Sequence, residues 1–212
     1  MLLTTIKALF EVGDHYGYPQ GIKGYVAGKR MAEQHRPENL WTVNLLDAQP
    51  TDHVLEIGFG PGLALEHLAP RLVAGQLLGI DASSTMVRMA ARRNRMAIRS
   101  GRVRLRRANA ASLPFEDTSL DKIYSIHSLY FWPDPVLVMQ EMVRVLKPDG
   151  LICLTFMARA QWPGGGLGDE KCHVYAAEDV CELLMRSGCT RTHIDRGPAD
   201  KPFREVAVLG YK

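Results

Sequence analysis

The sequence predicts a doubly wound α/β fold around a mostly parallel seven-stranded sheet that ends in an antiparallel hairpin. Three observations support this prediction. Short apolar runs alternate with segments of helical spacing, the first run leads directly into a cluster of glycines, and the last third holds two strand-like runs joined by a loop. Strand, helix, strand succession favours parallel pairing through right-handed crossovers, which places helices on both faces of the sheet.

The composition fits one globular unit. The chain has 212 residues, of which 46% are hydrophobic, so a core can form without a disulfide or a structural metal. Disordered, collagen-like and disulfide-scaffold classes are excluded by the same figures. No apolar run is long enough to cross a bilayer, and the first ten residues lack the pattern of a secretory signal. We therefore expect a cytoplasmic protein without a membrane partner.

The first part of the predicted sheet has three strands, at residues 54–57, 77–80 and 103–105. Two helices connect them. One covers residues 63–73, and the other begins at Ser83 or Ser84, which can cap it, and ends at Gly101. In the third strand apolar residues alternate with Arg104 and Arg106, which is typical of a strand with one covered and one wetter face.

The second part of the sheet follows the same alternation and then changes. Strands are predicted at residues 121–126 and 151–156 around a helix at 135–146, and a helix at 177–187 precedes a hairpin of strands at 190–194 and 206–211. The first fifty residues are less regular, with a helix near 40–47. Ligands of open α/β sheets bind at the carboxyl ends of the strands. We therefore expect residues 1–50 to form an N-terminal helical cap over that edge and residues 51–212 to form the ligand-binding domain.

The glycine-rich turn after the first strand is the sharpest functional signal. Gly58, Gly60 and Gly62 let the backbone approach a ligand closely. A dinucleotide fingerprint would need glycine or alanine where Leu63 stands, and a phosphate-binding loop would need a lysine that is missing. Glu56, just upstream, favours a ligand with a cationic group over one with a pyrophosphate.

Two polar residues follow the next two strands. Asp81 ends the second strand, where a carboxylate can accept both hydroxyls of a ribose; the alternative is an aspartate that only caps a helix. Asn109 follows the third strand, where its amide can meet an adenine edge, although a turn residue is an almost equally good interpretation.

With these features the chain resembles the class I S-adenosylmethionine-dependent methyltransferases. The resemblance is closest to the small-molecule branch that includes ubiquinone and menaquinone biosynthesis enzymes, also described as methyltransferase type 11. It covers about residues 51–156. Four segments carry it: EIGFGPG at 56–62, GIDAS at 79–83, LPF at 113–115 leading to LD at 120–121, and RVLKPDG at 144–150.

The resemblance implies a Rossmann-like fold and the cofactor S-adenosyl-L-methionine. It places the glycines under the cofactor, Asp81 on the ribose, and Ala82 and Met86 beside the adenine. The family commonly has aspartate where this chain has Asn109. The reaction implied is in-line methyl transfer to an O, N, S or C atom of a small organic acceptor. The predicted cofactor-binding residues are Glu56, Gly58, Gly60, Gly62, Asp81, Ala82, Met86, Asn109 and Ala110.

His127 is the predicted catalytic residue. It follows the fourth strand, where the family's motif faces the methyl group, and it can position the acceptor or act as a base. The alternative is a loop histidine that offers only its backbone. Aromatic residues are expected to enclose the acceptor, and residues 163–168 form either a flap or a plain connection. The predicted substrate-binding residues are Tyr16, Tyr25, Tyr130, Trp132 and Trp162.

Other functions remain possible from the sequence. Nine arginines lie between Arg88 and Arg107, and such a surface can bind RNA, although the spacing on a predicted helix favours a solvated face. A non-catalytic cofactor-binding protein is the third possibility. The four cysteines lack the spacing of a zinc site, so no metal is expected. The expected partner is a small molecule rather than nucleic acid, while the acceptor and the oligomeric state stay open.

Overall fold

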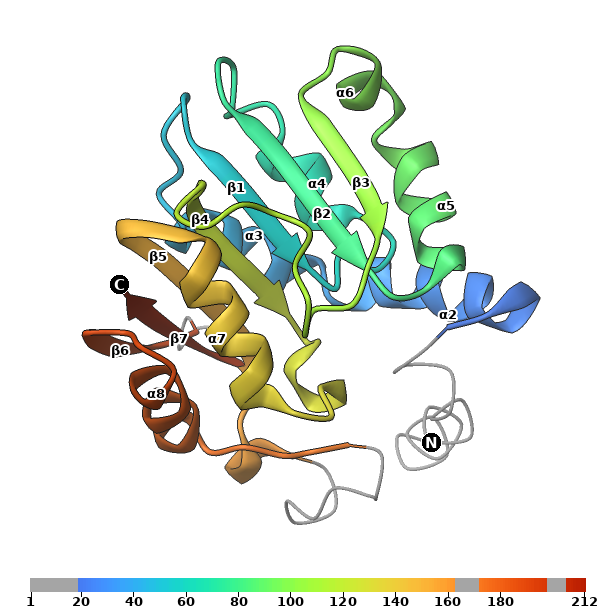
Figure 1. Cartoon of the computed structure of the whole chain (residues 1–212). Helices are drawn as coiled ribbons and strands as arrows, with labels where there is room; N and C mark the ends of the chain where they lie inside the picture. The colour runs from blue at the N-terminus through green and yellow to red at the C-terminus, as the bar shows by residue number, and fades with distance from the viewer. Residues whose placement is uncertain (1–18, 163–171, 198–204) are drawn as a thin grey trace.

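A computed structural model describes residues 19–162, 172–197 and 205–212. They contain a seven-stranded sheet with the order β3-β2-β1-β4-β5-β7-β6 (Figure 1). Strands β1 to β5 pair in parallel, and β7 is antiparallel to both β5 and β6. The predicted fold class is therefore confirmed, including the terminal hairpin. The strands are β1 His53–Ile57, β2 Gln76–Asp81, β3 Val103–Arg107, β4 Leu120–Ile126, β5 Leu146–Met157, β6 Arg191–Arg196 and β7 Glu205–Tyr211.

Helices cover both faces of this sheet. One core cluster joins it to α3, α4 and α5, and a second joins it to α7 and α8, which lie on the near side in Figure 1. The helices are α2 Gly21–Gln34, α3 Arg36–Leu45, α4 Leu63–Leu68, α5 Ser84–Arg93, α6 Arg95–Arg99, α7 Pro135–Val145 and α8 Ala177–Arg186, with 3-10 turns η2 Leu129–Phe131 and η3 Arg159–Gln161. In the described part of the chain, no helix is long and apolar enough to span a membrane.

The central strands are buried on both faces. Leu55 and Ile57 of β1 pack into the cluster with α7 and α8, whereas Val54 packs into the cluster with α3 and α4. This explains why β1 reads as a continuous apolar run rather than an alternating one. The carboxyl end of β1, where the glycine-rich turn begins, is therefore packed against helices on both faces of the sheet.

Three of the predicted helices have other boundaries. The helix predicted near residues 40–47 is α3, which begins at Arg36 and ends at Leu45. Helix α4 ends at Leu68 rather than at residue 73, and Pro70, which has no backbone N–H to continue the helix, follows two residues later. The helix expected from Ser83 or Ser84 to Gly101 is interrupted at Asn94, giving α5 and α6. The buried side-chain amide of Asn94 donates to the carbonyls of Gly62 and Ala90, both at 3.0 Å. The interruption thus ties α5 to the glycine-rich turn.

Helix α2 lies at the edge where β1, β2 and β3 end (Figure 1). Its Gly28 packs against the side chains of Met86 and Met89, and the hydroxyl of Ser83 donates to the carbonyl of Pro19 just before the helix. Helix α3 packs on the sheet, where Thr42 Oγ1 and Thr155 Oγ1 are 2.7 Å apart. The proposed division at residue 50 stays a prediction, since residues 1–18 lie outside the described part.

Candidate active site

The glycine-rich turn connects β1 to α4. Gly58, Gly60 and Gly62 have φ values of +73°, +51° and +79°, a region that residues with side chains rarely adopt. At Gly58 an added Cβ would lie 2.5 Å from the hydroxyl oxygen of Ser128. At Gly60 the nearest atom to an added Cβ is the terminal methyl of Met31, at 4.0 Å. The turn is therefore packed tightly at Gly58, whereas at Gly60, which is buried, a Cβ would meet no described atom closer than 4.0 Å.

Asp81 faces this turn from the end of β2. Its Oδ2 accepts from the backbone N–H of Gly60 at 2.9 Å, and its Oδ1 accepts from that of Ser83 at 2.8 Å. Burial raises the pKa of Asp81 to about 6, and the two hydrogen bonds act in the opposite direction. Each carboxylate oxygen keeps a lone pair for a further donor. The carboxylate is thus fixed beside Gly60 and can still accept hydrogen bonds from a ligand.

Glu56 lies below the turn, inside the sheet. Its side chain is 2% exposed, and the hydroxyl of Tyr124 donates to its Oε2 at 2.8 Å. Burial raises the pKa of Glu56 to about 8; the Tyr124 hydrogen bond opposes this shift, and the charge of Asp81 adds to it. Sequence reasoning did not single out Tyr124, because its contact follows from the pairing of Glu56 with Tyr124 in adjacent strands.

The residues expected beside the adenine have varied surroundings. Met86 is 1% exposed and packs in the core against Gly28, so little of its surface remains for a ligand. Ala82 is exposed, and Ala110 is half-buried against the core. Asn109 is exposed, and its Oδ1 accepts from the N–H of Ala111 at 3.0 Å. Its amide oxygen thus closes a local turn, which is the alternative that the sequence left open.

His127 directly follows β4 and has the unusual φ of +53°. Its N–H donates to the carbonyl of Thr155 at 2.9 Å, and its Nδ1 lies 3.1 Å from the hydroxyl of Tyr130. Burial, together with the neighbouring His35, holds the pKa of His127 well below its usual value. The 3.8 Å approach of its Nε2 to Glu205 therefore joins a neutral imidazole and a carboxyl group and is no ion pair.

Aromatic rings line the chain beside His127. Tyr130 and Trp132 are buried, the indole N–H of Trp132 donates to Ser128 Oγ at 3.0 Å, and the ring of Trp162 lies 4.9 Å from that of Tyr130. Tyr25 is on α2, 39% exposed, with the ammonium of Lys29 5.4 Å from its ring centre. Tyr16 and the loop at 163–168 lie outside the described residues.

Ser128 links the two halves of the site. It follows His127 in the chain, contacts Gly58, and accepts the hydrogen bond from Trp132. Sequence reasoning did not identify this role, since serine after a strand is a common loop residue. Because Ser128 contacts Gly58, its neighbour His127 also lies close to the glycine-rich turn.

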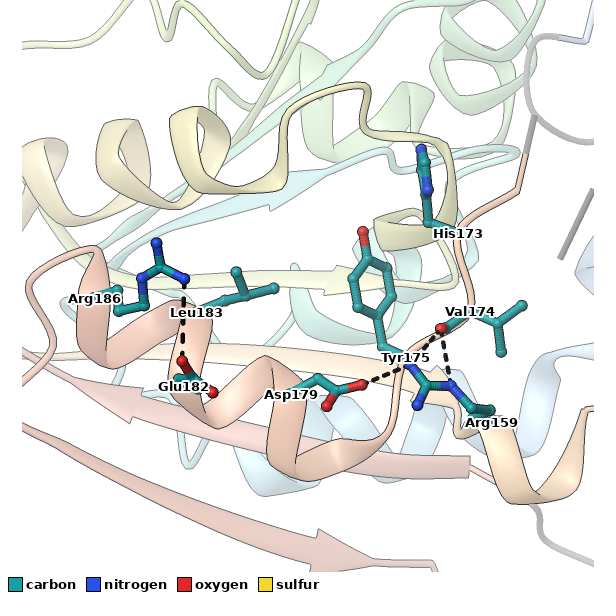
Figure 2. Close-up of a pocket in the computed structure, with 8 residues that line it drawn as sticks. All are labelled: Arg159, His173, Val174, Tyr175, Asp179, Glu182, Leu183 and Arg186. Atoms are coloured by element: carbon teal, nitrogen blue, oxygen red, sulfur yellow. Dashed lines mark hydrogen bonds and ion pairs between the residues drawn. The ribbon is translucent and has the colours of Figure 1, made fainter. Parts of the chain in front are cut away.

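Two hollows lie elsewhere. One, of about 330 Å³, is beside α8 (Figure 2), and Arg159 in it is bound to Asp179 at 2.7 Å and to the carbonyl of Val174. The other, of about 350 Å³, lies over β2 and β3 and is lined by Arg104, Arg106 and Phe115 among others. The lining of neither includes the glycine-rich turn, Asp81 or His127.

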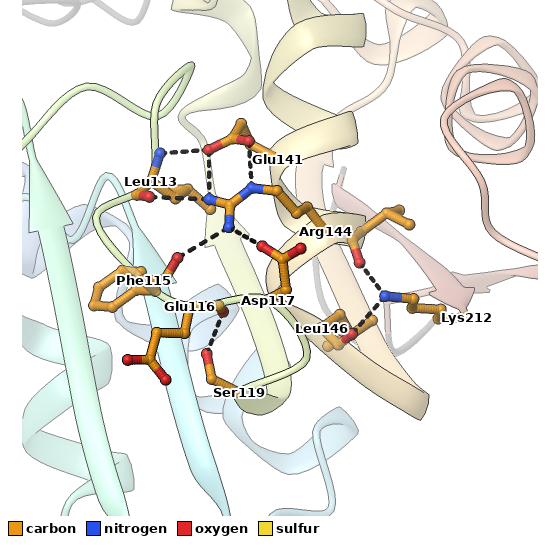
Figure 3. A network of polar contacts seen from close by, with 10 residues as sticks. Leu113, Phe115, Glu116, Asp117, Ser119, Glu141, Arg144, Leu146 and Lys212 are labelled. Atoms are coloured by element: carbon orange, nitrogen blue, oxygen red, sulfur yellow. Dashed lines mark hydrogen bonds and ion pairs between the residues drawn. The ribbon is translucent and has the colours of Figure 1, made fainter.

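The segment RVLKPDG has a structural role. The guanidinium of Arg144 binds both oxygens of Glu141, a carboxylate oxygen of Asp117 at 2.6 Å, and the carbonyls of Leu113 and Phe115 (Figure 3). It thereby fixes the LPF segment beside the start of β4. This contact explains why these two motifs occur together in one sequence.

Comparisons with known proteins agree with this geometry. The methyltransferase domain family Methyltransf_11 matches residues 55–154. The uncharacterized methyltransferase YdaC of Bacillus subtilis is 33% identical over 134 residues, covering 63% of this chain and 72% of the relative. The methyltransferase GfsG of Streptomyces halstedii is 34% identical over 205 residues, covering 92% of this chain and 66% of the relative.

A solved structure shows the same fold. It is the SAM-dependent methyltransferase of Thermotoga maritima described as a possible histamine N-methyltransferase, with a TM-score of 0.67 and 19% identity over 87% of this chain and 94% of that one. With this fold and the relatives above, the chain belongs to the class I S-adenosylmethionine-dependent methyltransferases. Its cofactor is S-adenosyl-L-methionine, whose sulfonium makes the methyl group electrophilic when bound.

The residues present fit this cofactor. The left-handed glycines keep side chains out of the turn, no described atom lies closer than 4.0 Å to a Cβ placed at Gly60, and the Asp81 carboxylate accepts a hydrogen bond from the Gly60 N–H. The predicted roles of the individual cofactor-binding residues stay predictions.

Proposed function

We propose that the chain transfers the methyl group of S-adenosyl-L-methionine to an O, N, S or C atom of a small organic acceptor. The observation that carries this proposal is the joint fixing of the turn and the carboxylate, with Gly60 N and Asp81 Oδ2 2.9 Å apart. The Thermotoga maritima protein of the same fold is described as a possible histamine N-methyltransferase, and histamine is a small amine, which is consistent with a small acceptor.

In this proposal the turn holds the cofactor, and Asp81 accepts hydrogen bonds from the ribose hydroxyls. Most of the acceleration then comes from holding the two reactants in line. His127 acts on the acceptor side as a positioning group or base, because its backbone is fixed beside Ser128 and its imidazole is neutral. The buried rings of Tyr130 and Trp132 stiffen the same loop.

Calorimetry with the cofactor and with its demethylated product tests the proposal. Asp81→Ala is expected to weaken cofactor binding by about 2–3 kcal/mol, or about 30- to 150-fold in Kd, because charge-assisted hydrogen bonds are lost. Glu182→Ala, on the exposed face of α8, is the charge control and is expected to bind normally. If the folded wild-type chain binds neither compound, the proposal is wrong; if Asp81→Ala binds as tightly as the wild type, Asp81 has no role in the site.

A screen of candidate acceptors with labelled cofactor then separates the possible functions. Methylated small-molecule product supports the proposal, whereas cofactor binding without turnover supports a non-catalytic protein. RNA retention that falls steeply with salt would favour an RNA acceptor on the basic surface, where Arg88, Arg92, Arg95 and Arg99 are all exposed.

A further inference from the structure

Three potential metal-ligating atoms converge beside the proposed active site. His35, Glu38 and His127 each offer one such atom, and these atoms all lie within 4.8 Å of one another. His35 stands between α2 and α3, Glu38 is in the first turn of α3, and His127 follows β4. The ring centres of the two histidines are 4.4 Å apart. Three separate segments of the chain therefore bring these side chains to one point.

In each of these residues one side-chain atom is buried and has no hydrogen-bond partner within the described residues: His35 Nδ1, Glu38 Oε2 and His127 Nε2. Buried polar atoms in proteins are nearly always paired, so an unpaired one calls for an explanation. A neutral histidine has one ring N–H and one lone-pair nitrogen, so His35 Nδ1 and His127 Nε2 each carry a lone pair in the tautomer that is protonated on the other nitrogen. A shared partner that accepts electron pairs would satisfy all of them at once.

A second carboxyl group borders the cluster. Glu205, at the start of β7, is 6% exposed, and its Oε1 lies 3.8 Å from His127 Nε2. Glu38 and Glu205 also interact through their side chains. This second carboxyl group therefore offers a further oxygen atom at the edge of the cluster.

We propose that His35, Glu38 and His127 bind one divalent transition-metal ion of the Zn²⁺ type, with Glu205 beside it as a further oxygen ligand. Two imidazoles and a carboxylate are a common ligand set for such ions, whereas Mg²⁺ and Ca²⁺ prefer oxygen ligands alone. Ligand atoms lie about 2.0–2.2 Å from Zn²⁺, so the three must approach to about 3.5 Å, which small side-chain rotations achieve.

The surroundings of His127 suit this role. Metal-bound histidines usually donate their other ring N–H to an oxygen, and His127 Nδ1 lies 3.1 Å from the hydroxyl of Tyr130. In the tautomer whose Nδ1–H donates to this oxygen, Nε2 keeps its lone pair for the metal. A bound metal takes up that lone pair, so in the metal-bound chain His127 is a positioning group and not a base. The site goes beyond the proposed methyl transfer, and its occupancy can be measured without cofactor or acceptor.

The sequence predicted no metal site because its ligands are distant in the chain. Only His35 and Glu38 are near each other in the sequence, at the N-cap and in the first turn of α3; His127 and Glu205 join them through tertiary structure.

The test uses the full chain without a histidine tag, stripped with a chelator. Titration with ZnCl₂ in a calorimeter is expected to show one saturable site, CoCl₂ to give visible absorption bands, and MgCl₂ to show no binding at this site. His35→Gln and Glu38→Gln are each expected to weaken Zn²⁺ binding by about 100-fold or more, because each removes a ligand. His193→Gln, at an exposed position of β6, is the matched control and is expected to bind normally.

Absence of saturable Zn²⁺ binding to the folded wild-type chain would overturn the proposal, as would equal affinity in wild type and His35→Gln. Circular dichroism checks the folding of each variant. X-ray absorption at the zinc edge of the wild-type protein needs no variant: two imidazole nitrogens at about 2.0 Å support the site, and a ligand set without them refutes it. A folded wild-type chain that binds Zn²⁺ but not the cofactor would contradict the methyl-transfer proposal and leave the metal-site proposal intact.

Discussion

Glu56 is the residue whose surroundings have the clearest consequence for pH. Its pKa of about 8 exceeds the ordinary value of 4.5, so the folded chain binds this proton more tightly than the unfolded chain. The stabilising contribution of Glu56 is therefore complete below about pH 4.5 and is lost as the pH rises to about 8. Asp81, with a pKa of about 6, acts in the same direction at lower pH.

We expect Glu56→Gln to flatten the pH dependence of stability. Between pH 6 and 8 the wild-type free energy of unfolding should fall by about 2 kcal/mol more than that of Glu56→Gln, since one pKa unit corresponds to about 1.4 kcal/mol. Urea denaturation of both proteins at pH 6, 7 and 8 measures this difference. Parallel curves for the two proteins would show that Glu56 is ionised in the folded chain near pH 6.

At the scale of elements, the break between α5 and α6 matters because Asn94, at this break, bonds to the glycine-rich turn through its side chain. Asn94→Ala removes the amide that donates to the carbonyls of Gly62 and Ala90. We expect unfolding to become easier by about 1–2 kcal/mol, because two buried carbonyls lose a donor. Thermal denaturation measures the loss, and cofactor affinity should fall with it.

Ser100→Ala at the exposed end of α6 is the control for this prediction, since its hydroxyl donates only to the carbonyl of Ala97. A loss of stability in Ser100→Ala equal to that in Asn94→Ala would contradict a special role for the interruption.

Elements were predictable wherever local pattern decides them. All seven strands were predicted, the central ones from apolar runs and β3 from apolar residues that alternate with arginines, and α7 begins where Asp134 caps it and Pro135 opens it. The interruption at Asn94 was not predictable, because its cause is a hydrogen bond to Gly62, 32 residues away. The early start of β5 at Leu146 likewise depends on pairing with Leu120 across the sheet.

At the scale of the whole molecule, Arg144 joins helix α7 to the long connection between β3 and β4 (Figure 3). Arg144→Met keeps an unbranched apolar side chain and removes the guanidinium with its five donors. We expect a loss of about 2 kcal/mol in the free energy of unfolding, a moderate figure because the side chain is 32% exposed. Urea denaturation measures it.

Arg186→Met on α8 is the matched control, since its contact with Glu182 is exposed and 4.0 Å long. If both arginine variants lose the same stability, the network around Arg144 has no special importance.

Like the secondary-structure elements, the candidate site has a part that the sequence predicts and a part that it does not. The glycine-rich turn and Asp81 could be predicted, because both follow directly from strands along the chain. The pairing of Tyr124 with Glu56 and the meeting of His35 with His127 could not, because residues 68 and 92 positions apart in the sequence are brought together by the sheet and by α3.

The position of β7 has a consequence for biosynthesis. This strand lies between β5 and β6 but follows β6 in the chain, so β6 leaves the ribosome before its neighbour in the sheet exists. Until then the nascent chain carries an open edge at β5, where a chaperone or another unfinished chain can add a strand. Because Glu205 begins β7, the insertion of β7 beside β5 also brings this carboxyl group to His127.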